Sequence, residues 1–182
     1  MLPEHVLAWP VVLRHFAQTD SERVQQLAGD RAVADTTALI PHPYPAGAAE
    51  AWIAGHAAER ARATQYAYAI TRGEDGLLVG AIALRPVADE HENVGYWIGR
   101  EYWNHGYATA ATRAMITLAF KCLDCQQITA SYLERNPASG RVLEKCGLVL
   151  VRREARDHRG REEPFCVRGI TRDAWEILAR AD

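Results

Sequence analysis

The stretch Trp103-Asn-His-Gly-Tyr-Ala-Thr-Ala-Ala-Thr-Arg-Ala-Met-Ile-Thr-Leu-Ala-Phe120 decides the fold. It joins a Gly-x-Ala turn, at Gly106 and Ala108, directly to a helix with an apolar face. A short aromatic strand, Val94-Gly-Tyr-Trp-Ile98, comes just before it. The first N–H groups of a helix lack partners within the helix and lie at its positive end, and glycine lets the main chain approach a ligand closely. The sequence therefore predicts a phosphate-binding turn at Gly106, where this helix begins.

Composition limits the class of protein. The chain has 182 residues, 48% of them hydrophobic, which suits one domain with a buried core. Its 21 Lys and Arg residues against 23 Asp and Glu residues give a net charge of −2. Since no basic stripe is present, we expect no nucleic-acid partner. A small anionic ligand stays compatible with this charge, because it needs only a local site.

The termini and the cysteines bear on location. The start, Met-Leu-Pro-Glu-His, lacks the basic residues and the apolar run of a signal peptide, and no apolar stretch reaches membrane-spanning length. Cys122-x-x-Cys125 has no second pair at metal spacing, so we interpret it as structural and expect no metal. Free cysteines without an export signal indicate the reducing cytoplasm, and we expect no membrane partner.

Hydrophobic periodicity divides the chain into elements. We expect helices over residues 19–62, in which the proline-rich segment Pro41–Pro45 is extended. The predicted strands are Val11–His15, Gln65–Thr71, Leu77–Leu84, Val94–Ile98, Gln127–Leu133, Leu148–Val151 and Phe165–Ile170. Pro86 should end the third strand, Asp89–Asn93 should form a polar loop, and Arg152–Glu163 should form a charged hairpin. This order of elements predicts a single α+β domain over residues 1–182 with a mixed sheet.

A second motif, Asn136-Pro-Ala-Ser139, lies between a predicted strand and a predicted helix. Both polar side chains can cap the helix and both can bind a ligand, so the two roles stay open. Gly147 is placed to end that helix in a left-handed C-cap. The scattered histidines, by default solvated, are His91, His105 and His158.

Four pieces of the chain, taken together, resemble a known family. They are Ile40-Pro-His-Pro-Tyr44, then Gly95-Tyr-Trp-Ile98 with Tyr102-Trp103-x-x-Gly106-Tyr-Ala-Thr109, then Asn136-Pro-Ala-Ser139 with Val142-Leu-Glu-Lys-Cys-Gly147, and finally Arg172-Asp-Ala-Trp175. In this order they resemble the GNAT N-acetyltransferase superfamily, in its ribosomal-protein N-acetyltransferase branch (RimJ/RimL-like). The resemblance runs from about residue 11 to residue 178.

The resemblance implies a fold and a cofactor site. The fold would be a mixed, mostly antiparallel, twisted sheet of about seven strands, flanked by helices and splayed between Val94–Ile98 and Gln127–Leu133. The core that binds acetyl-CoA would cover about residues 76–150, and the helices on the acceptor side about residues 19–62. The residues expected to hold acetyl-CoA are Trp97, Ile98, Asn104, His105, Gly106, Tyr107, Ala108, Thr109, Asn136 and Ser139.

The resemblance also implies the chemistry. Acetyl would pass from acetyl-CoA to a primary amine by direct attack in a ternary complex, most simply to the N-terminal α-amino group of a protein or peptide. Ser139 would lie near the thioester sulfur and deliver a proton to it. In this branch a glutamate is often found two residues before the Gly-Tyr-Trp motif, which begins here at Gly95; that position is Asn93 in this chain, with Glu92 beside it. The candidates for a general base are therefore Glu92 and His158, directly or through water.

Two alternatives stay open at this stage. The first is an acetyltransferase for a small amine, such as a polyamine, an amino acid or an antibiotic. The second is a non-catalytic domain that binds acyl-CoA, which would explain why Ala110 stands where the family usually has an acidic residue. The acceptor groove, expected from residues 19–62 and the 152–163 hairpin, should distinguish a peptide from a small amine. The resemblance also allows a homodimer, since dimers are common in this branch.

Overall fold

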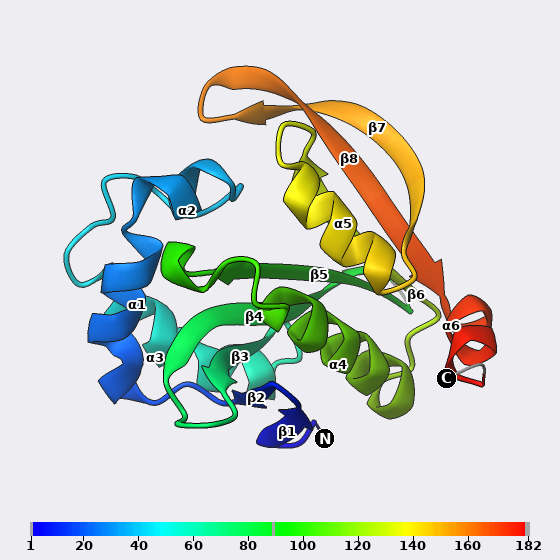
Figure 1. Cartoon of the computed structure of the whole chain (residues 1–182), viewed down its shortest axis with the longest axis horizontal. Helices are drawn as coiled ribbons and strands as arrows, with labels where there is room; N and C mark the ends of the chain where they lie inside the picture. Colours follow the sequence, from blue (N-terminus) through cyan, green and yellow to red (C-terminus); the bar gives the residue numbers. More distant parts are fainter. Residues whose placement is uncertain (1, 89, 181–182) are drawn as a thin grey trace.

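The computed structural model describes residues 2–88 and 90–180 and contains one mixed sheet (Figure 1). Its strands lie in the order β1-β2-β3-β4-β5-β6-β8-β7, and only the β5–β6 pair is parallel. The strands are β1 His5–Ala8, β2 Val11–Arg14, β3 Tyr66–Arg72, β4 Leu78–Ala88, β5 His91–Ile98, β6 Gln127–Leu133, β7 Val149–His158 and β8 Arg161–Thr171. The predicted α+β fold with a mixed, mostly antiparallel sheet is therefore confirmed.

Helices cover this sheet. They are α1 Ser21–Ala28, α2 Arg31–Asp35, α3 Ala48–Ala61, α4 Tyr107–Cys122, α5 Pro137–Lys145 and α6 Arg172–Ala179, with the short 3-10 turns η1 Gln18–Asp20 and η2 Arg100–Tyr102. Within the described residues, no helix has the length and apolar character needed to cross a bilayer.

The strand count of about seven was one too low, because β1 was missed. The side chains of β1 alternate only between exposed and half-buried, and Leu7 is 85% exposed. A strand at the edge of a sheet needs little apolar patterning, so its sequence gives little signal.

The prediction that Pro86 ends a strand was also wrong, since β4 continues to Ala88. The pairing of β3 with β4 begins only at Tyr66 and Leu84, so β4 has β5 as its single neighbour beyond that point. A proline, which lacks an N–H group, is tolerated where one side of a strand has no partner.

Two polar segments contain more strand than the sequence predicted. The segment Asp89–Asn93 was expected to be a polar loop, but β5 begins at His91, so residues 91–93 are strand. The predicted charged hairpin Arg152–Glu163 is confirmed, and its strands β7 and β8 continue through it to a turn at residues 159–160. In both hairpins a polar sequence concealed cross-strand pairing, since a ribbon that faces solvent can be polar and still form its ladder.

The sheet splays in its middle. Strands β5 and β6 are paired only at His91–Gln127, Glu92–Ile128 and Asn93–Thr129. Beyond Asn93 the two strands diverge, and residues 94–98 keep a neighbouring strand on the β4 side alone. The predicted splay between these strands is confirmed, and it opens a gap in the middle of the sheet.

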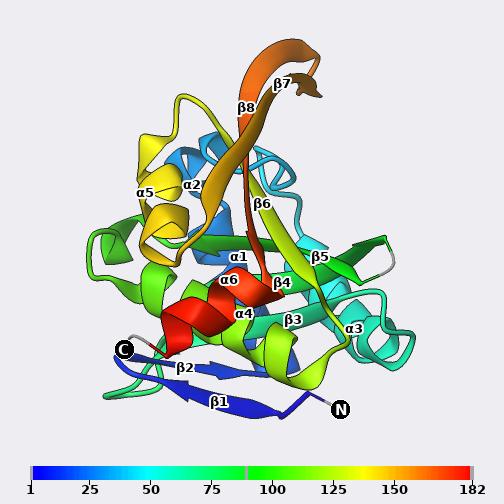
Figure 2. The same cartoon turned by 90° about the vertical axis from the view of Figure 1, so that its right-hand side faces the viewer.

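The two faces of the sheet are covered by different helices. Met115 and Ile116 of α4 pack in one cluster with Val94 of β5, whereas α1 and α3 pack in a second cluster that includes Trp97 of β5. Successive side chains of a strand point to opposite faces, so even-numbered residues of β5 face α4 and odd-numbered ones face α1 and α3. Figure 2 shows β7 and β8 rising beyond the rest of the sheet.

Helix α5 begins and ends as its sequence predicts. At its start the Asn136 side chain accepts a hydrogen bond from the main chain of Ser139. At its end Gly147 has φ +85°, the Gly147 N–H donates to the Glu144 carbonyl at 2.9 Å, and the Leu148 N–H donates to the Leu143 carbonyl at 3.0 Å. This is the Schellman pattern, in which glycine takes the left-handed position.

Candidate active site

The turn before α4 presents free main-chain donors. Asn104 has φ +67° and Gly106, the N-cap of α4, has φ +80°, which are left-handed conformations that asparagine and glycine tolerate best. Within the described residues, no acceptor is hydrogen-bonded to the main-chain N–H groups of residues 104–109. A Cβ built at Gly106 would meet no atom within 4 Å. Open space, free donors and the positive end of a helix together form a site suited to an anion.

The turn is anchored to the end of β5. The indole Nε1 of Trp103 donates to the carbonyl oxygen of Ile98 at 2.7 Å. His105 is exposed, lies stacked against Tyr107 with 5.4 Å between ring centroids, and has Nδ1 2.9 Å from the Trp103 carbonyl. The expected acetyl-CoA residues of this turn are thus brought together on the surface, directly after Trp97 and Ile98 of the splayed strand.

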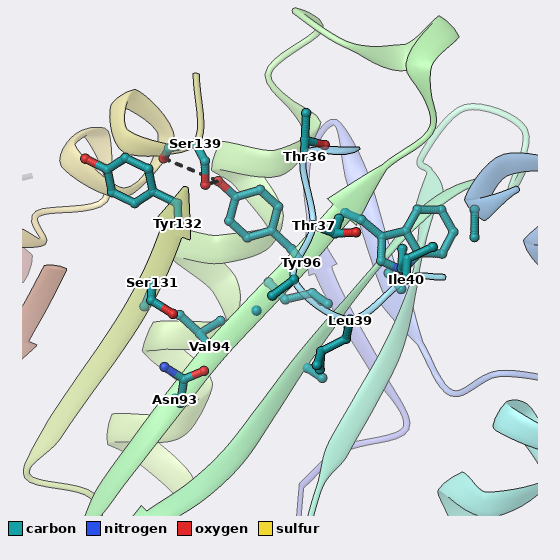
Figure 3. A pocket seen from close by; sticks show the side chains of 18 of the residues that line it. Thr36, Thr37, Leu39, Ile40, Asn93, Val94, Tyr96, Ser131, Tyr132 and Ser139 are labelled. Atoms are coloured by element: carbon teal, nitrogen blue, oxygen red, sulfur yellow. Dashed lines mark hydrogen bonds between the residues drawn. The ribbon is translucent and has the colours of Figure 1, made fainter. Parts of the chain in front are cut away.

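A cavity of about 660 Å³ lies at the splay. Its walls come from the segment of residues 36–41, from β4 and β5, from β6, and from the start of α5. Figure 3 shows Asn93 of β5 and Ser131 of β6 on the two facing strands, with Thr37, Leu39 and Ile40 on the opposite side. The cavity therefore joins the sheet gap to the acceptor-side elements.

Ser139 and Tyr96 are joined inside this cavity. The hydroxyl oxygens of the two side chains lie 2.9 Å apart, from α5 and β5 respectively (Figure 3). Burial raises the pKa of Tyr96, so the phenol keeps its proton at neutral pH. Tyr132 of β6 packs beside them, since a Cβ added to Gly140 would lie 2.6 Å from the Tyr132 hydroxyl. The pair can pass a proton to a group bound in the splay.

Tyr96 was absent from the residues selected by sequence. The sequence feature that could have identified Tyr96 is its position between Gly95 and Trp97 in the aromatic strand. The sequence analysis used that strand only as support for the turn at Gly106. That the Tyr96 side chain points toward α5 follows only from the separation of β5 and β6 beyond Asn93, which lets it reach Ser139.

Asn136 connects two parts of the cavity wall. Its Oδ1 accepts from the Ser139 N–H at 3.3 Å, and its Nδ2 donates to the Thr36 carbonyl at 3.4 Å. The capping role is thus present, and the same side chain holds α5 against the segment of residues 36–41.

The structure does not bring Glu92 to the cavity. Glu92 is not among the residues that line it, and strand alternation places its side chain on the α4 face of β5, within the paired part of the strand. Burial raises the pKa of Glu92, and its Oε2 has no hydrogen-bond partner within the described residues. Asn93, on the opposite face, lines the cavity, and its Nδ2 donates to the Thr129 carbonyl at 3.2 Å; Val94 and Tyr96 reach the cavity because β5 and β6 separate beyond Asn93. The sequence prediction treated this segment as a loop, which would have left Glu92 free to turn.

His158 also lies outside the cavity. It is 4% exposed, with Nδ1 2.9 Å from Glu163 Oε1 and Nε2 3.1 Å from the Thr37 carbonyl. Hydrogen bonds from Arg135 first and from His158 second lower the pKa of Glu163 to about 2. His158 therefore fastens the tip of the β7–β8 hairpin to the segment of residues 36–41, which is one wall of the cavity.

Comparison with known families agrees with this geometry. The family model described as "Acetyltransferase (GNAT) domain" matches residues 11–149. The chain belongs to the GNAT acetyltransferase family. This match covers the splay, the turn before α4 and the Asn136–Ser139 motif within one family pattern.

Individual relatives are more distant. The chain is 35% identical over 77 residues to YdaF of Bacillus subtilis (strain 168), which is named "Putative ribosomal N-acetyltransferase". The aligned stretch covers 41% of this chain and 42% of YdaF. The chain spans less than half the length of the curated relatives that it matches.

Solved structures share the fold over nearly the whole chain. A GNAT-family acetyltransferase from Bacillus anthracis has a TM-score of 0.83 at 20% identity and covers 93% of this chain and 99% of its own. RimL, described as a ribosomal L7/L12 alpha-N-protein acetyltransferase in complex with coenzyme A, has a TM-score of 0.84 at 15% identity, with 94% and 99% covered. At these identities the likeness shows the fold alone.

Proposed function

We propose that this GNAT protein is an acetyl-CoA-dependent N-acetyltransferase whose acceptor is the α-amino group of a protein or peptide N-terminus. The observation that carries the proposal is the row of free N–H groups at residues 104–109, beside a splayed strand and a cavity. The coenzyme A named in the RimL complex supports the same co-substrate for this chain.

The co-substrate would lie along the splay, in the core of about residues 76–150. The N–H groups of Asn104 to Thr109 suit its diphosphate, because they combine free donors with the helix dipole. The pantetheine arm suits the open side of β5 at Trp97 and Ile98, where main-chain groups have no strand partner. Asn136 and Ser139 at the start of α5 would border the same arm.

The reaction needs an attacking amine and a protonated leaving group. A neutral amine nitrogen forms the C–N bond with the thioester carbon, a main-chain N–H near Ile98 stabilises the oxyanion, and the C–S bond then breaks. The thiolate takes a proton from the Ser139 hydroxyl, and Tyr96 returns one to Ser139. The nitrogen releases its own proton to water and Tyr96 takes one back from water, so that the phenol is restored and protons balance over the cycle.

The cavity favours an amine that is easily deprotonated. Among its described lining residues there is no Asp, Glu or His side chain that could act as a base. An α-amino group has a pKa of about 8, whereas a lysine side chain has one of about 10.4, so the former supplies far more neutral amine at pH 7. This supports an N-terminal acceptor, approached from the helices of residues 19–62.

The test is the release of free thiol from acetyl-CoA with a panel of acceptors. The panel contains short peptides with free N-termini, the same peptides with blocked N-termini, free amino acids and spermidine. Turnover with free but not blocked peptides is expected. Turnover with spermidine alone would assign a small-amine enzyme, and binding of acetyl-CoA without turnover on any acceptor would assign a binding domain. The proposal also places the protein in the cytoplasm, where its four free cysteines stay reduced.

A further inference from the structure

The charge of the cavity differs from that of the chain. The chain has a net charge of −2, yet the charged side chains among the described lining residues are two arginines, Arg85 and Arg156. Both face a space in which the acceptor must place its nitrogen. A cavity with this sign disfavours a cationic ligand and attracts an anionic one.

Arg85 is held without being neutralised. Its Nε donates to Oε1 of Gln65, which is buried at 6% exposure and in turn donates to Oε2 of Glu59 at 2.9 Å. Within residues 2–88 and 90–180, no carboxylate forms an ion pair with Arg85, and its two terminal nitrogens have no hydrogen-bond partner. The partner of Arg85 is thus the neutral amide of Gln65, which does not neutralise the guanidinium as a carboxylate would. The two terminal nitrogens of Arg85 stay available as donors to a ligand.

Arg156 adds to the positive charge from the other side of the splay. Its Nη1 donates to Ser131 Oγ at 3.0 Å, and its guanidinium lies 5.2 Å from the Phe165 ring centroid. The Glu154 carboxylate beside it is shared with Arg152. One carboxylate between two guanidinium groups leaves this group of three with a net charge of +1, although Arg152 lies outside the cavity lining, so Arg85 is the lining cation without an ion pair within the described residues.

The position of Arg85 gives the length of the acceptor that it can reach. In the β4–β5 ladder Arg85 is opposite Asn93, and Ala83, two residues along β4, is opposite Gly95 beside the Tyr96–Ser139 pair. Two strand residues span about 7 Å, which is about the length of two residues of an extended peptide. A carboxylate one or two residues from the reacting nitrogen therefore comes within reach of the guanidinium.

We propose that the acceptor carries a carboxylate close to its α-amino group and that Arg85, positioned by Gln65, binds this carboxylate. The inference rests on the proposed function and narrows its substrate class to anionic amines. The carboxylate comes either from an acidic side chain near a peptide N-terminus or from the end of a short acceptor. The same positive field keeps the bound amine neutral and excludes polyamines.

The experiment compares matched acceptors with the full chain. The specificity constant kcat/KM is measured for the amidated peptides Ala-Asp-Ala-Ala and Ala-Asn-Ala-Ala, and for free Ala-Ala against Ala-Ala amide. The first pair tests a side-chain carboxylate and the second a terminal one. Dissociation constants of the same acceptors for the protein saturated with coenzyme A, by calorimetry, give a readout that does not need turnover.

The variants separate charge from packing. Gln65→Glu, made together with Glu59→Gln so that residues 59 and 65 keep one donor and one acceptor, offers Arg85 a carboxylate of the same size. Arg85→Gln removes the positive charge, and Arg85→Lys keeps it. Arg161→Gln removes one positive charge from the turn-side end of β8, outside the cavity, and is the matched control. Within each variant the uncharged acceptor serves as the reference, so a general loss of folding or activity cancels in the ratio.

In the wild-type protein, kcat/KM for the acid-bearing acceptor of at least one pair is expected to be about tenfold or more higher than for its uncharged partner. A hydrogen bond between charged groups contributes about that much to binding. Gln65→Glu and Arg85→Gln should bring this ratio near one, whereas Arg85→Lys and Arg161→Gln should keep most of it. Ratios near one in the wild-type protein, or ratios that neither Gln65→Glu nor Arg85→Gln changes, overturn the inference. Absence of turnover with every amine refutes the proposed function instead, and the ratio of dissociation constants then decides this inference.

Discussion

Substitution of Gly106 separates binding of the co-substrate from folding. A Cβ at this position meets nothing within 4 Å, so Gly106→Glu meets no steric barrier in the folded protein. The cost to folding is the left-handed φ of +80°, about 1–2 kcal/mol for a non-glycine residue. A typical domain has about 5–15 kcal/mol of stability, so the variant should stay folded.

Gly106→Glu should weaken the binding of coenzyme A by more free energy than it costs in folding stability. The added carboxylate would lie among the N–H groups of residues 104–109 and would repel a diphosphate while competing for its donors. Loss of two hydrogen bonds to a charged group, at about 1.5–3 kcal/mol each, corresponds to at least about a 100-fold weaker affinity. The measurements are the dissociation constant of coenzyme A by calorimetry and the free energy of unfolding in urea.

Gly76 provides a matched control. It has φ +72° in the β3–β4 turn, and a Cβ there also meets nothing within 4 Å. Gly76→Glu should lose similar stability and keep its affinity for coenzyme A. The reasoning fails if Gly106→Glu binds coenzyme A within about threefold of the wild-type protein, or if Gly76→Glu weakens binding as much.

Other substitutions test the neighbouring features. Ser139→Ala should lower kcat about 100-fold and change the KM for acetyl-CoA less than threefold, because the Tyr96–Ser139 pair acts on the leaving group; steady-state kinetics measure both, and an equal effect on each would indicate a binding role. Trp103→Phe should weaken coenzyme A about fivefold in calorimetry, since it removes the 2.7 Å hydrogen bond to Ile98 that anchors the turn, worth about 1 kcal/mol; unchanged affinity would show that the turn holds without it. Burial lowers the pKa of His56 to about 4, so the unfolded chain, with a pKa of about 6.5, takes up the proton first as pH falls. Stability from this group is complete above pH 6.5 and is lost toward pH 4, so urea unfolding should show a loss of about 2 kcal/mol between pH 7 and pH 5 that His56→Phe lacks; the same loss in both proteins would contradict this.

The sequence predicted the elements whose signals are local. The turn before α4 follows from Gly106, the C-cap of α5 follows from Gly147, and the splay follows from the family resemblance carried by the residues around them. These features depend on short-range chain geometry, which the residue types themselves restrict.

The predictions from sequence were wrong or incomplete where a residue's conformation or direction depends on the elements packed beside it. Pro86 lies within a strand only because β3 has already ended, and Glu92 faces α4 only because β5 begins earlier than its polar residues suggest. The positions of Tyr96 and His158 depend on elements far away in the chain. Side-chain direction in a strand reverses with each residue, so an error of one residue in a strand's start changes which residues reach a site.

The tip of the β7–β8 hairpin grips a distant part of the chain. Arg159 donates to the carbonyls of Ala34 and Ile40 at 2.7 Å each, and His158 bonds the Thr37 carbonyl between them. The anion-binding turn, by contrast, lies in the segment between β5 and α4, and none of its residues 104–109 is hydrogen-bonded to the hairpin within the described residues. Changes in the hairpin can therefore alter this wall of the cavity while the turn at residues 104–109 stays as it is. The C-terminal ribbon is thus the place to begin altering the proposed acceptor specificity without altering the proposed coenzyme A site.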